Sequence, residues 1–506
     1  MSLGQSLSIA LVGLTGHVIS VEVDIADGLP GYSLLGLPDA ALMESRDRVR
    51  SALVNSGEVW PNKKVTVSLS PAWMHKSGSG FDLPIAIALL AASGKIPESR
   101  SAHTMYLGEL ALDGRIRGIR GVLPSLIAAH KNGIRIAVVP DANLAEATLM
   151  SEMTVIGMDN IASLLHWLRT GERSHVQELP LEDSSPDDSL DFCDVAGQDA
   201  ARFAAEVSAV GGHHLLLIGP PGTGKTMIAQ RLPGILPPLT REESLEVTAL
   251  HSIAGSLSSR SPLSTTAPFI SPHHTATRVA MVGGGSHQIR PGACSLAHRG
   301  VLFIDEAPEC GVGVLDSLRQ PLESGSITIA RSVGSVAYPA QFLLILAANP
   351  CPCGMFSGRG RNCTCSSQQV RRYLSKLSGP LMDRIDLRVE VEPLGRVQLM
   401  ESELNNSSAD IRKRVVRARD IARQRFSLDP WKLNSQIPSR ALRTQYQPER
   451  KAMTFLHSEL DQENISARGL HKIMRTAWSI ADLASHERPT LEDTERAFTL
   501  REGVGA

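Results

Sequence analysis

The chain has 506 residues, of which 42% are hydrophobic and 20% charged, the composition of a globular protein of about three domains. Its net charge of −1 at pH 7 excludes a uniformly basic surface that would attract nucleic acid from every side. Only 4% of the residues are aromatic, which argues against a broad base-stacking platform. Any nucleic-acid contact must therefore be local.

The N-terminal segment and the cysteines predict a cytoplasmic protein without a membrane partner. The opening MSLGQSLSIALVGLTGHV lacks the basic residues that precede the apolar part of a secretory signal. The densest apolar run, LPIAIALLAA from Leu83, is too short to cross a bilayer. Seven cysteines, four of them in one short stretch, fit a reducing compartment better than a disulfide framework.

The first part of the chain, residues 1–170, alternates strand-like and helix-like patterns with frequent turns such as GLPGYSLLGLPDA. We interpret it as an α/β domain. The next stretch, residues 171–193, is polar, acidic and interrupted by proline, with little to bury. We interpret this second stretch as an interdomain linker.

Residues 194–392 have the pattern of an α/β domain around a parallel sheet. Three expected strands, HLLLIG, GVLFIDE and FLLILAANP, are too aliphatic for a sheet with one face in water. The first strand runs into GPPGTGKT, which matches the phosphate-loop pattern, and a helix-like TMIAQRL follows. The loop consists of Gly219, Pro220, Pro221, Gly222, Thr223, Gly224, Lys225 and Thr226.

This loop predicts a site for ATP and Mg²⁺. Its glycines let backbone N–H groups turn inward around the β-phosphate, and Lys225 neutralises the β- and γ-oxygens. Thr226 offers a hydroxyl to Mg²⁺.

Two further expected strands end in polar residues that suit hydrolysis. We expect GVLFIDEAPE on the strand beside the phosphate-loop strand, with Asp305 holding Mg²⁺ through water. Glu306 then orients and polarises the attacking water. Asn349, at the end of the third strand, lies beside the γ-phosphate if the strands are neighbours, and its amide holds water without adding charge.

The stretch CPCGMFSGRGRNCTC places Cys351, Cys353, Cys363 and Cys365 within 15 residues. Four thiolates can surround Zn²⁺ tetrahedrally and leave no open position for catalysis, so we predict a structural zinc site. Each pair is C-x-C, tighter than the usual C-x₂-C, and free thiols or redox pairs are the alternatives. The adjacent His273 and His274 point to different sides, so polar loop contacts are the better interpretation for them.

Residues 393–506 are predicted to be helical. ADIRKRVVRARDIARQRF places Ile411, Val415, Ala418 and Ala422 on one stripe with basic residues around the rest. We interpret those arginines as a solvated helix face rather than as a track for DNA.

Several motifs, in this order, make the chain similar to an AAA+ ATPase of the magnesium-chelatase-related ComM/YifB family. They are SPHHTATRVAMVGGG, SLAHRGVLFIDEAPE, AANPCPCG, RYLSKLSGPLMDRIDL and SARGLHKIMRTAWSIADL. In the same resemblance, DVAGQDAARFAAEVSAVGGHHLLLIGPPGTGKT is the AAA+ entry segment, which implies that Val195 and Gln198 lie near the adenine. The resemblance implies a helical lid over residues 393–506 and extra hairpins in the core.

The resemblance also assigns residues to the family's sensing positions. Asn349 falls at the sensor-1 position and Arg468 at the sensor-2 position. Arg384 matches the arginine finger, which acts on the nucleotide of a neighbouring subunit and so implies a ring, a homo-hexamer. A guanidinium arriving from the neighbour stabilises charge on the transferring phosphoryl group. The alternative for Arg384 is a simple ion pair with Asp383 or Asp386.

Two inserts bear on a DNA partner. GSITIARSVGSVAYPAQF alternates like a β-hairpin with a turn near Gly334, and in related motors this hairpin touches DNA in the central channel. Arg331 is the basic residue near its tip. The glycine-rich TATRVAMVGGGSHQIRPGA offers Arg290. One or two phosphate contacts per subunit, repeated around a ring, would give salt-dependent binding, and ordinary polar loops are the alternative.

The segments HKSGSGFDLPIAIALLAASGK and LGELALDGRIRGIRGVLPSLIAAHKNGIRIAVVP make residues 1–170 similar to the protease domain of Lon, with its ribosomal-S5-like α/β fold. The slot of the Lon serine holds Asp82, and the slot of its lysine holds Leu123. A Ser–Lys dyad needs a hydroxyl and an amine, so we expect no proteolysis.

Taken together, the nucleotide site and the family resemblance favour a ring-forming AAA+ ATPase that remodels DNA. The resemblance implies helicase or branch-migration activity on recombination intermediates during transformation. One alternative is a chelatase subunit that drives metal insertion into a tetrapyrrole, although no metal-adhesion domain follows the core. Another is a regulatory ATPase that remodels proteins. DNA-stimulated ATP hydrolysis separates the first from the other two.

Overall fold

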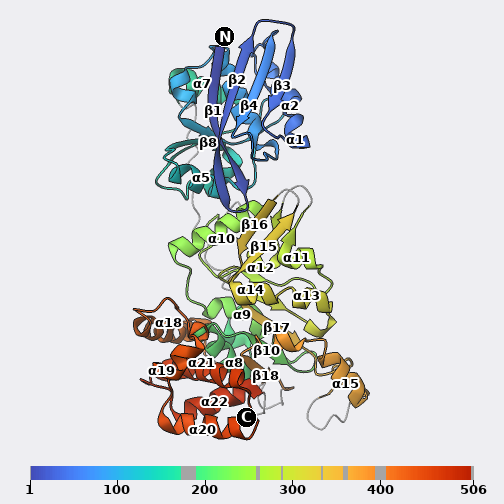
Figure 1. Ribbon diagram of the computed structural model, residues 1–506, viewed down its shortest axis with the longest axis vertical. Helices are drawn as coiled ribbons and strands as arrows, with labels where there is room; N and C mark the ends of the chain where they lie inside the picture. The colour runs from blue at the N-terminus through green and yellow to red at the C-terminus, as the bar shows by residue number, and fades with distance from the viewer. Residues whose placement is uncertain are drawn as a thin grey trace.

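The computed structural model describes residues 2–172, 190–257, 262–285, 289–331, 334–356, 363–393 and 406–502. Figure 1 shows an N-terminal sheet domain at one end of the long axis, a second α/β domain in the middle and a helical domain at the other end. Most of the expected linker, residues 171–193, lies outside the described residues. Within the described ranges, no helix combines the length and apolar character that crossing a membrane requires.

The N-terminal domain is built on a mixed seven-stranded sheet. Antiparallel pairing joins β1 to β2 and β2 to β4, and the remaining neighbours are parallel. In order across the sheet, the strands are β3 (Gly31–Leu35), β4 (Lys64–Ser70), β2 (Thr15–Ala26), β1 (Ser2–Val12), β5 (Thr104–Tyr106), β8 (Ile136–Pro140) and β9 (Thr154–Met158).

Helices cover both faces of this sheet. α2 (Ser45–Asn55), α3 (Asp82–Ala92) and α7 (Ile161–Thr170) share one apolar core with the strands, and α5 (Val122–Lys131) with α6 (Leu144–Ala147) packs into the other. The apolar run that begins at Leu83, which is too short to cross a membrane, forms α3. This helix is buried along almost its whole length. A helix apolar all round is stable only inside a core.

The middle domain contains a five-stranded sheet in which every pairing is parallel. Its order is β11 (Phe269–Ile270), β14 (Val301–Ile304), β17 (Leu343–Ala348), β10 (Leu215–Ile218) and β18 (Leu387–Glu390). All six residues of β17 are buried, as the aliphatic pattern predicts for a sheet with both faces covered. The mixed α/β class with a parallel sheet is therefore confirmed.

One expectation about this sheet is wrong. We expected the strand ending at Asp305 to lie beside the phosphate-loop strand, but β17 lies between β14 and β10. A local hydrophobic pattern identifies a buried strand and carries no information on its neighbours, because crossover helices let chain order and sheet order differ. Asn349, which follows β17, therefore lies between the phosphate loop after β10 and Asp305 after β14.

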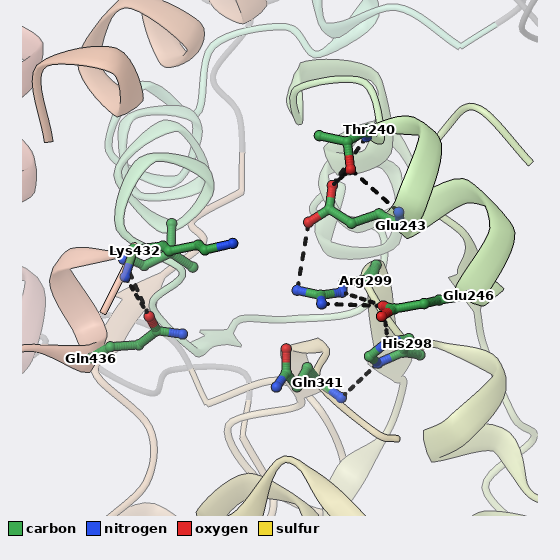
Figure 2. Close-up of polar contacts among 9 residues, drawn as sticks. Thr240, Glu243, Glu246, His298, Arg299, Gln341, Lys432 and Gln436 are labelled. Atoms are coloured by element: carbon green, nitrogen blue, oxygen red, sulfur yellow. Dashed lines mark hydrogen bonds and ion pairs between the residues drawn. The ribbon is translucent and has the colours of Figure 1, made fainter. Parts of the chain in front are cut away.

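α10 (Arg241–Ala254) is tied to the amino ends of β14 and β17 by the polar cluster drawn in Figure 2. Arg299 lies between Glu243 and Glu246, at 3.5 and 3.2 Å. Burial lowers the pKa of His298, whose Nδ1 accepts from the Gln341 N–H. Its Nε2 therefore donates to Glu246, at 3.2 Å, and the neutral ring joins helix to sheet.

The predicted hairpin is present, formed by β15 (Ser326–Arg331) and β16 (Gly334–Pro339). The turn between β1 and β2 packs on it, since a Cβ at Gly13 would lie 2.5 Å from Cγ1 of Val336. Figure 1 shows this turn reaching down to the hairpin. The N-terminal domain thus contacts an insert of the middle domain.

A second contact between these domains is polar and buried. Ser252 of α10 accepts from the Gly121 N–H at 3.1 Å and donates to Glu146 of α6. Glu146 also accepts from the Leu123 N–H at 2.7 Å, and burial raises the pKa of its carboxyl. These bonds fix the start of α5 against α10.

The described part of the C-terminal segment is helical. Its longer helices are α18 (Ser408–Arg425), α20 (Arg450–Asp461), α21 (Ala467–Ala484) and α22 (Leu491–Glu502). The predicted apolar stripe of α18 is buried in a core shared with α8 (Asp199–Gly211) and α9 (Lys225–Ile235). The helical domain is therefore packed against the helices that follow and precede the phosphate-loop strand.

The interpretation of the α18 arginines as a solvated face is wrong for four of them. Arg412 donates to the carbonyl of Gly234 at 2.6 Å, and Arg425 pairs with Asp482. Arg414 makes two hydrogen bonds to the Glu206 carboxylate, at 2.7 and 2.9 Å. Arg419 donates to the carbonyl of Ala209. Glu206 and Ala209 lie on α8, so the guanidinium groups of Arg414 and Arg419 join the helical domain to the middle domain, because a buried carboxylate and an unpaired carbonyl both need donors.

Candidate functional site

The phosphate loop connects β10 to α9. Gly219 begins it, and its N–H donates to the carbonyl of Ala348 on β17 at 3.1 Å. Gly222 and Gly224 have φ of +79° and +92°, and nothing lies within 4 Å of a Cβ built on either. These glycines leave an open cradle lined by backbone, which is the shape that a chain of phosphates requires. The loop residues present therefore fit a nucleotide.

Lys225 is buried inside the loop. Its ammonium group donates to the carbonyls of Gly219 at 2.6 Å and Pro220 at 2.8 Å, and to Oδ1 of Asn349 at 3.3 Å. Burial lowers the pKa of Lys225, against the attraction of Asp305 and Glu306. The structure thus brings the predicted lysine and the predicted sensor-1 amide into contact across the end of β17.

Thr226 and Asp305 meet at the same edge of the sheet. The Thr226 hydroxyl donates to Oδ2 of Asp305 at 2.8 Å, and Oδ1 accepts from the backbone N–H of Glu306. A hydroxyl and a carboxylate side by side provide oxygen ligands that Mg²⁺ prefers. The residues present fit this ion.

Glu306 adopts a left-handed backbone conformation with φ of 48°, which aims its half-exposed carboxylate away from β14. Its Oε2 lies 3.5 Å from Nδ1 of His274. The rings of His273 and His274 lie against each other, tilted by 33° with their centroids 4.1 Å apart, so the expectation that they point to different sides is wrong. We preferred polar loop contacts for these histidines; His273 makes one, with the Thr275 hydroxyl at 2.8 Å, but the approach of His274 to Glu306 was not anticipated. Both histidines follow β11, which pairs with β14, and no spacing in the sequence signals this pairing.

Gln198 and Val195, both expected near the adenine, have different surroundings in the structure. Gln198 donates from Nε2 to the carbonyls of Thr223 at 3.2 Å and Glu392 at 2.7 Å, so it joins the phosphate loop to the end of β18. Val195 is buried in the apolar core.

Arg384 and Arg468 converge on Asp383 rather than on the phosphate loop of their own chain. Oδ2 of Asp383 lies 3.1 Å from Nη1 of Arg384 and 2.6 Å from Nη1 of Arg468. Arg384 also pairs with Glu323. The alternative ion pair with Asp383 is present, whereas Asp386 pairs instead with Lys472 at 3.2 Å.

The four cysteines form one cluster just beyond Asn349. Their sulfur atoms all lie within 4.8 Å of one another, and Cys351 is buried. The Sγ atoms of Cys351 and Cys353 are 3.3 Å apart. Metals bind the thiolate form of cysteine. Backbone N–H groups of Met355 and Thr364 favour it at Cys353 by lowering its pKa to about 5. At Cys363 and Cys365, by contrast, a backbone N–H group is outweighed by burial and by contacts with the neighbouring sulfur atoms, which raise the pKa. This arrangement could hold a metal ion.

Family models of the magnesium-chelatase group match most of the chain. Residues 191–399 match the model described as magnesium chelatase, subunit ChlI. Residues 21–143 match the model for subunit ChlI of Mg-chelatase, and residues 405–501 match its C-terminal model.

Curated relatives align over nearly the whole chain. An uncharacterised protein of Mycobacterium tuberculosis is 47% identical over 502 residues, 99% of each chain. The uncharacterised protein YifB of Escherichia coli is 40% identical over 505 residues, 99% of this chain and 97% of its own. Competence protein ComM of Haemophilus influenzae is 38% identical over 497 residues, 96% of this chain and 95% of its own. The chain belongs to the magnesium-chelatase-related ComM/YifB family. This is a family of AAA+ ATPases.

In this ComM/YifB protein, the two positions that correspond to the Lon serine and lysine hold Asp82 and Leu123. Asp82 is buried and makes two hydrogen bonds to the Arg48 guanidinium, at 2.6 and 2.9 Å. Burial raises the pKa of Asp82 to about 6, although Arg48 opposes the rise. Leu123 is fully buried at the start of α5. The carboxylate is thus engaged in an ion pair within the core of the domain.

The two predicted DNA contacts of this ComM/YifB chain lie on separate inserts. Arg290 begins β13 (Arg290–Pro291), pairs through its backbone with Gly284 and is exposed. Arg331 ends β15, opposite Gly334, and its side chain lies outside the part of the chain that is described. Tyr338 of the hairpin donates to the carbonyl of Ile289 at 2.7 Å, so the inserts contact each other.

Proposed function

We propose that this chain is the subunit of a ring-forming, hexameric AAA+ ATPase that uses ATP hydrolysis to remodel DNA. Its action would be helicase or branch-migration activity on recombination intermediates, as in natural transformation. The observation that carries the ATPase part is the meeting of Lys225, Thr226–Asp305, Glu306 and Asn349 at the carboxyl ends of β10, β14 and β17. Ligands of open α/β sheets bind at this edge.

In the proposed mechanism, each side chain has one task. Lys225 holds the β- and γ-phosphates of ATP, and Asn349, in contact with its ammonium group, holds the attacking water. Glu306 accepts the proton of that water. Thr226 and Asp305 would hold Mg²⁺, which neutralises phosphate charge when bound. Gln198 fixes the phosphate loop from outside through Thr223.

We propose that the guanidinium group of Arg384 acts on the triphosphate of a neighbouring subunit, and that Arg468 on the helical lid senses the nucleotide. Both contact Asp383, and the structure gives neither a contact with its own phosphate loop among the described residues. A finger that acts on the neighbour's nucleotide needs a second copy of the chain to complete the site. ATP hydrolysis would therefore be a property of the ring.

Support for a DNA partner comes from the similarity to competence protein ComM and from the hairpin β15–β16 beside the exposed Arg290. The ATPase rate, measured with and without single-stranded and branched DNA over a salt series, tests this part. We expect stimulation by DNA that declines as salt rises, because phosphate contacts release counterions. If adding DNA leaves the ATPase rate unchanged at every salt concentration, the proposed DNA function is wrong.

The second candidate is a chelatase-type ATPase subunit, favoured by the matches to ChlI models. This candidate predicts an ATPase whose rate does not respond to DNA and which binds a partner subunit that carries the tetrapyrrole. A regulatory, protein-remodelling ATPase is the third candidate, in which the Lon-like domain acts as an adaptor. The same DNA titration separates both from the motor.

We propose that the cysteine cluster holds structural Zn²⁺. Four thiolates within 4.8 Å match its tetrahedral preference. Metal analysis of purified protein should give close to one equivalent of zinc per chain. Less than about a tenth of an equivalent would count against this assignment, because structural zinc sites bind tightly.

A further inference from the structure

The loop that carries the cysteines lies directly on the phosphate loop. Gly354 has φ of +76°, and a Cβ built on it would lie 2.7 Å from Cδ and 2.9 Å from Cγ of Pro221. Pro221 is the third residue of the phosphate loop. Contacts this short leave no space for a side chain, so the backbone of Gly354 packs directly against the ring of Pro221.

The same segment touches the phosphate loop at two further points. The Ala348 carbonyl accepts from the Gly219 N–H at 3.1 Å, and Oδ1 of Asn349 accepts from Lys225 at 3.3 Å. The buried Cys351 follows two residues later. Residues 348–354 therefore contact the beginning, the proline turn and the lysine of the loop that holds phosphates.

The cysteine cluster connects this segment to the next one. Cys351 begins, and Cys353 lies within, the turn in which the Gly354 N–H donates to the Cys351 carbonyl at 3.0 Å. Cys363 and Cys365 come from the chain ahead of α15 (Ser367–Leu374), and Sγ of Cys363 lies 3.6 Å from Sγ of both Cys351 and Cys353. A bound ion would tie the Gly354 turn to α15. Without it, close thiolates would repel one another.

We propose that a metal ion bound by these four cysteines positions the phosphate loop, so that occupancy of the metal site sets the affinity of the chain for ATP. The proposal rests on the proposed ATP site and adds a control on it. The ion touches no substrate. It acts through Gly354 on Pro221 and through Asn349 on Lys225.

The first test uses the full-length chain and Zn²⁺ alone. Zinc is removed by dialysis against a chelator, the chelator is removed, and the Kd for a fluorescent ATP analogue is measured in Mg²⁺ before and after one equivalent of Zn²⁺ is returned. We expect Kd to rise about 10- to 100-fold on removal, the cost of misplacing a positioned group by about an ångström, and to recover on return. Equal Kd values with and without zinc would overturn the proposal.

The second test keeps the metal and breaks the contact. Gly354→Ala introduces a Cβ against Pro221, and we expect weaker binding of the ATP analogue with an unchanged zinc content. Gly133→Ala is the matched control, because Gly133 also has positive φ, at +81°, but open space around its Cβ. It reproduces the backbone strain without the contact. Equal effects of the two substitutions on Kd would contradict the proposal.

The outcomes separate this inference from the proposed function. If zinc-loaded chain binds no ATP analogue, the ATP site itself fails. If it binds the analogue with the same Kd in zinc-free and zinc-loaded form, only the control by metal fails. A purified chain that takes up no zinc overturns the inference before any nucleotide is added.

Discussion

Glu306 illustrates how a single residue in this chain is held in a conformation that free residues avoid. A left-handed backbone at a residue other than glycine costs about 1–3 kcal/mol and persists where the surroundings fix it. At Glu306 the neighbouring Asp305 carboxylate accepts its N–H, and His274 faces its carboxylate. Such strain often occurs at functional sites, in agreement with the role proposed for this glutamate.

The prediction at Glu306 concerns the chemical step. Glu306→Gln keeps the size and the hydrogen-bonding capacity of the side chain but removes its ability to accept a proton. We expect ATP to bind with nearly the parent Kd and to be hydrolysed about 10²- to 10⁴-fold more slowly. Single-turnover hydrolysis with excess enzyme measures the step directly, and parent-like turnover would reject Glu306 as the base.

Asp386 supplies a prediction on pH. Burial opposes its charged form, but His213, whose Nδ1 lies 3.5 Å from Oδ2, and the ammonium group of Lys472, 3.2 Å from Oδ1, outweigh burial and lower the pKa of the carboxyl below its ordinary value of 3.8. Its contribution to stability is therefore present above pH 3.8 and is lost as the pH falls below it. Asp386→Asn should lower the free energy of unfolding at pH 7.

The destabilisation caused by Asp386→Asn should shrink as the pH falls below 3.8, because the parent carboxyl then becomes protonated in the unfolded chain. Urea titrations of parent and variant at a series of pH values measure this difference. A difference that stays constant from pH 7 to pH 3 would show that Asp386 does not act through its charge.

At the scale of elements, the sequence predicts whether a segment is a helix or a strand better than it predicts which other elements that segment packs against. The aliphatic runs correctly predict β10, β14 and β17, and the periodic stripe correctly predicts the buried face of α18. The insertion of β17 between β14 and β10 and the pairing of Arg414 with Glu206 were not predictable. Periodicity reports which face of an element is buried, and it says nothing about which element covers that face.

The two kinds of arginine on α18 give a prediction with an internal control. Arg414→Met leaves the Glu206 carboxylate, largely buried against α18, without its two hydrogen bonds. Because Arg414 is about a third exposed, we expect a loss of about 1–3 kcal/mol rather than the full cost of breaking a buried pair. Arg423→Met removes a surface pair with Asp420 and should cost under about 1 kcal/mol.

Urea unfolding of the two variants measures the difference between these arginines. Equal stability of Arg414→Met and Arg423→Met would show that the contact between α18 and α8 is no stronger than a surface pair.

The candidate site shows the same limit of prediction from sequence. The loop residues 219–226 follow from their spacing, whereas the approach of His274 to Glu306 depends on the pairing of β11 with β14.

At the scale of the whole molecule, the domains contact one another at elements that matter for the proposed motor. The N-terminal domain packs on the hairpin β15–β16 through Gly13 and on α10 through Ser252. The helical domain reaches the segment around Arg384, because Arg468 pairs with Asp383, and Lys472 donates to the Ile385 carbonyl at 2.9 Å. A movement of the helical domain would therefore also move the proposed finger.

The central claim is that neighbouring subunits share each ATP site, and mixing two inactive variants tests it most directly. Lys225→Ala removes the phosphate contact but keeps the finger, and Arg384→Ala does the reverse. Each alone should be nearly inactive. Co-assembled at equal amounts, they should recover about a quarter of the parent ATPase rate, because one neighbouring pair in four combines an intact loop with an intact finger. A mixture no more active than its separate components, or an Arg384→Ala variant with the parent rate, would contradict the account.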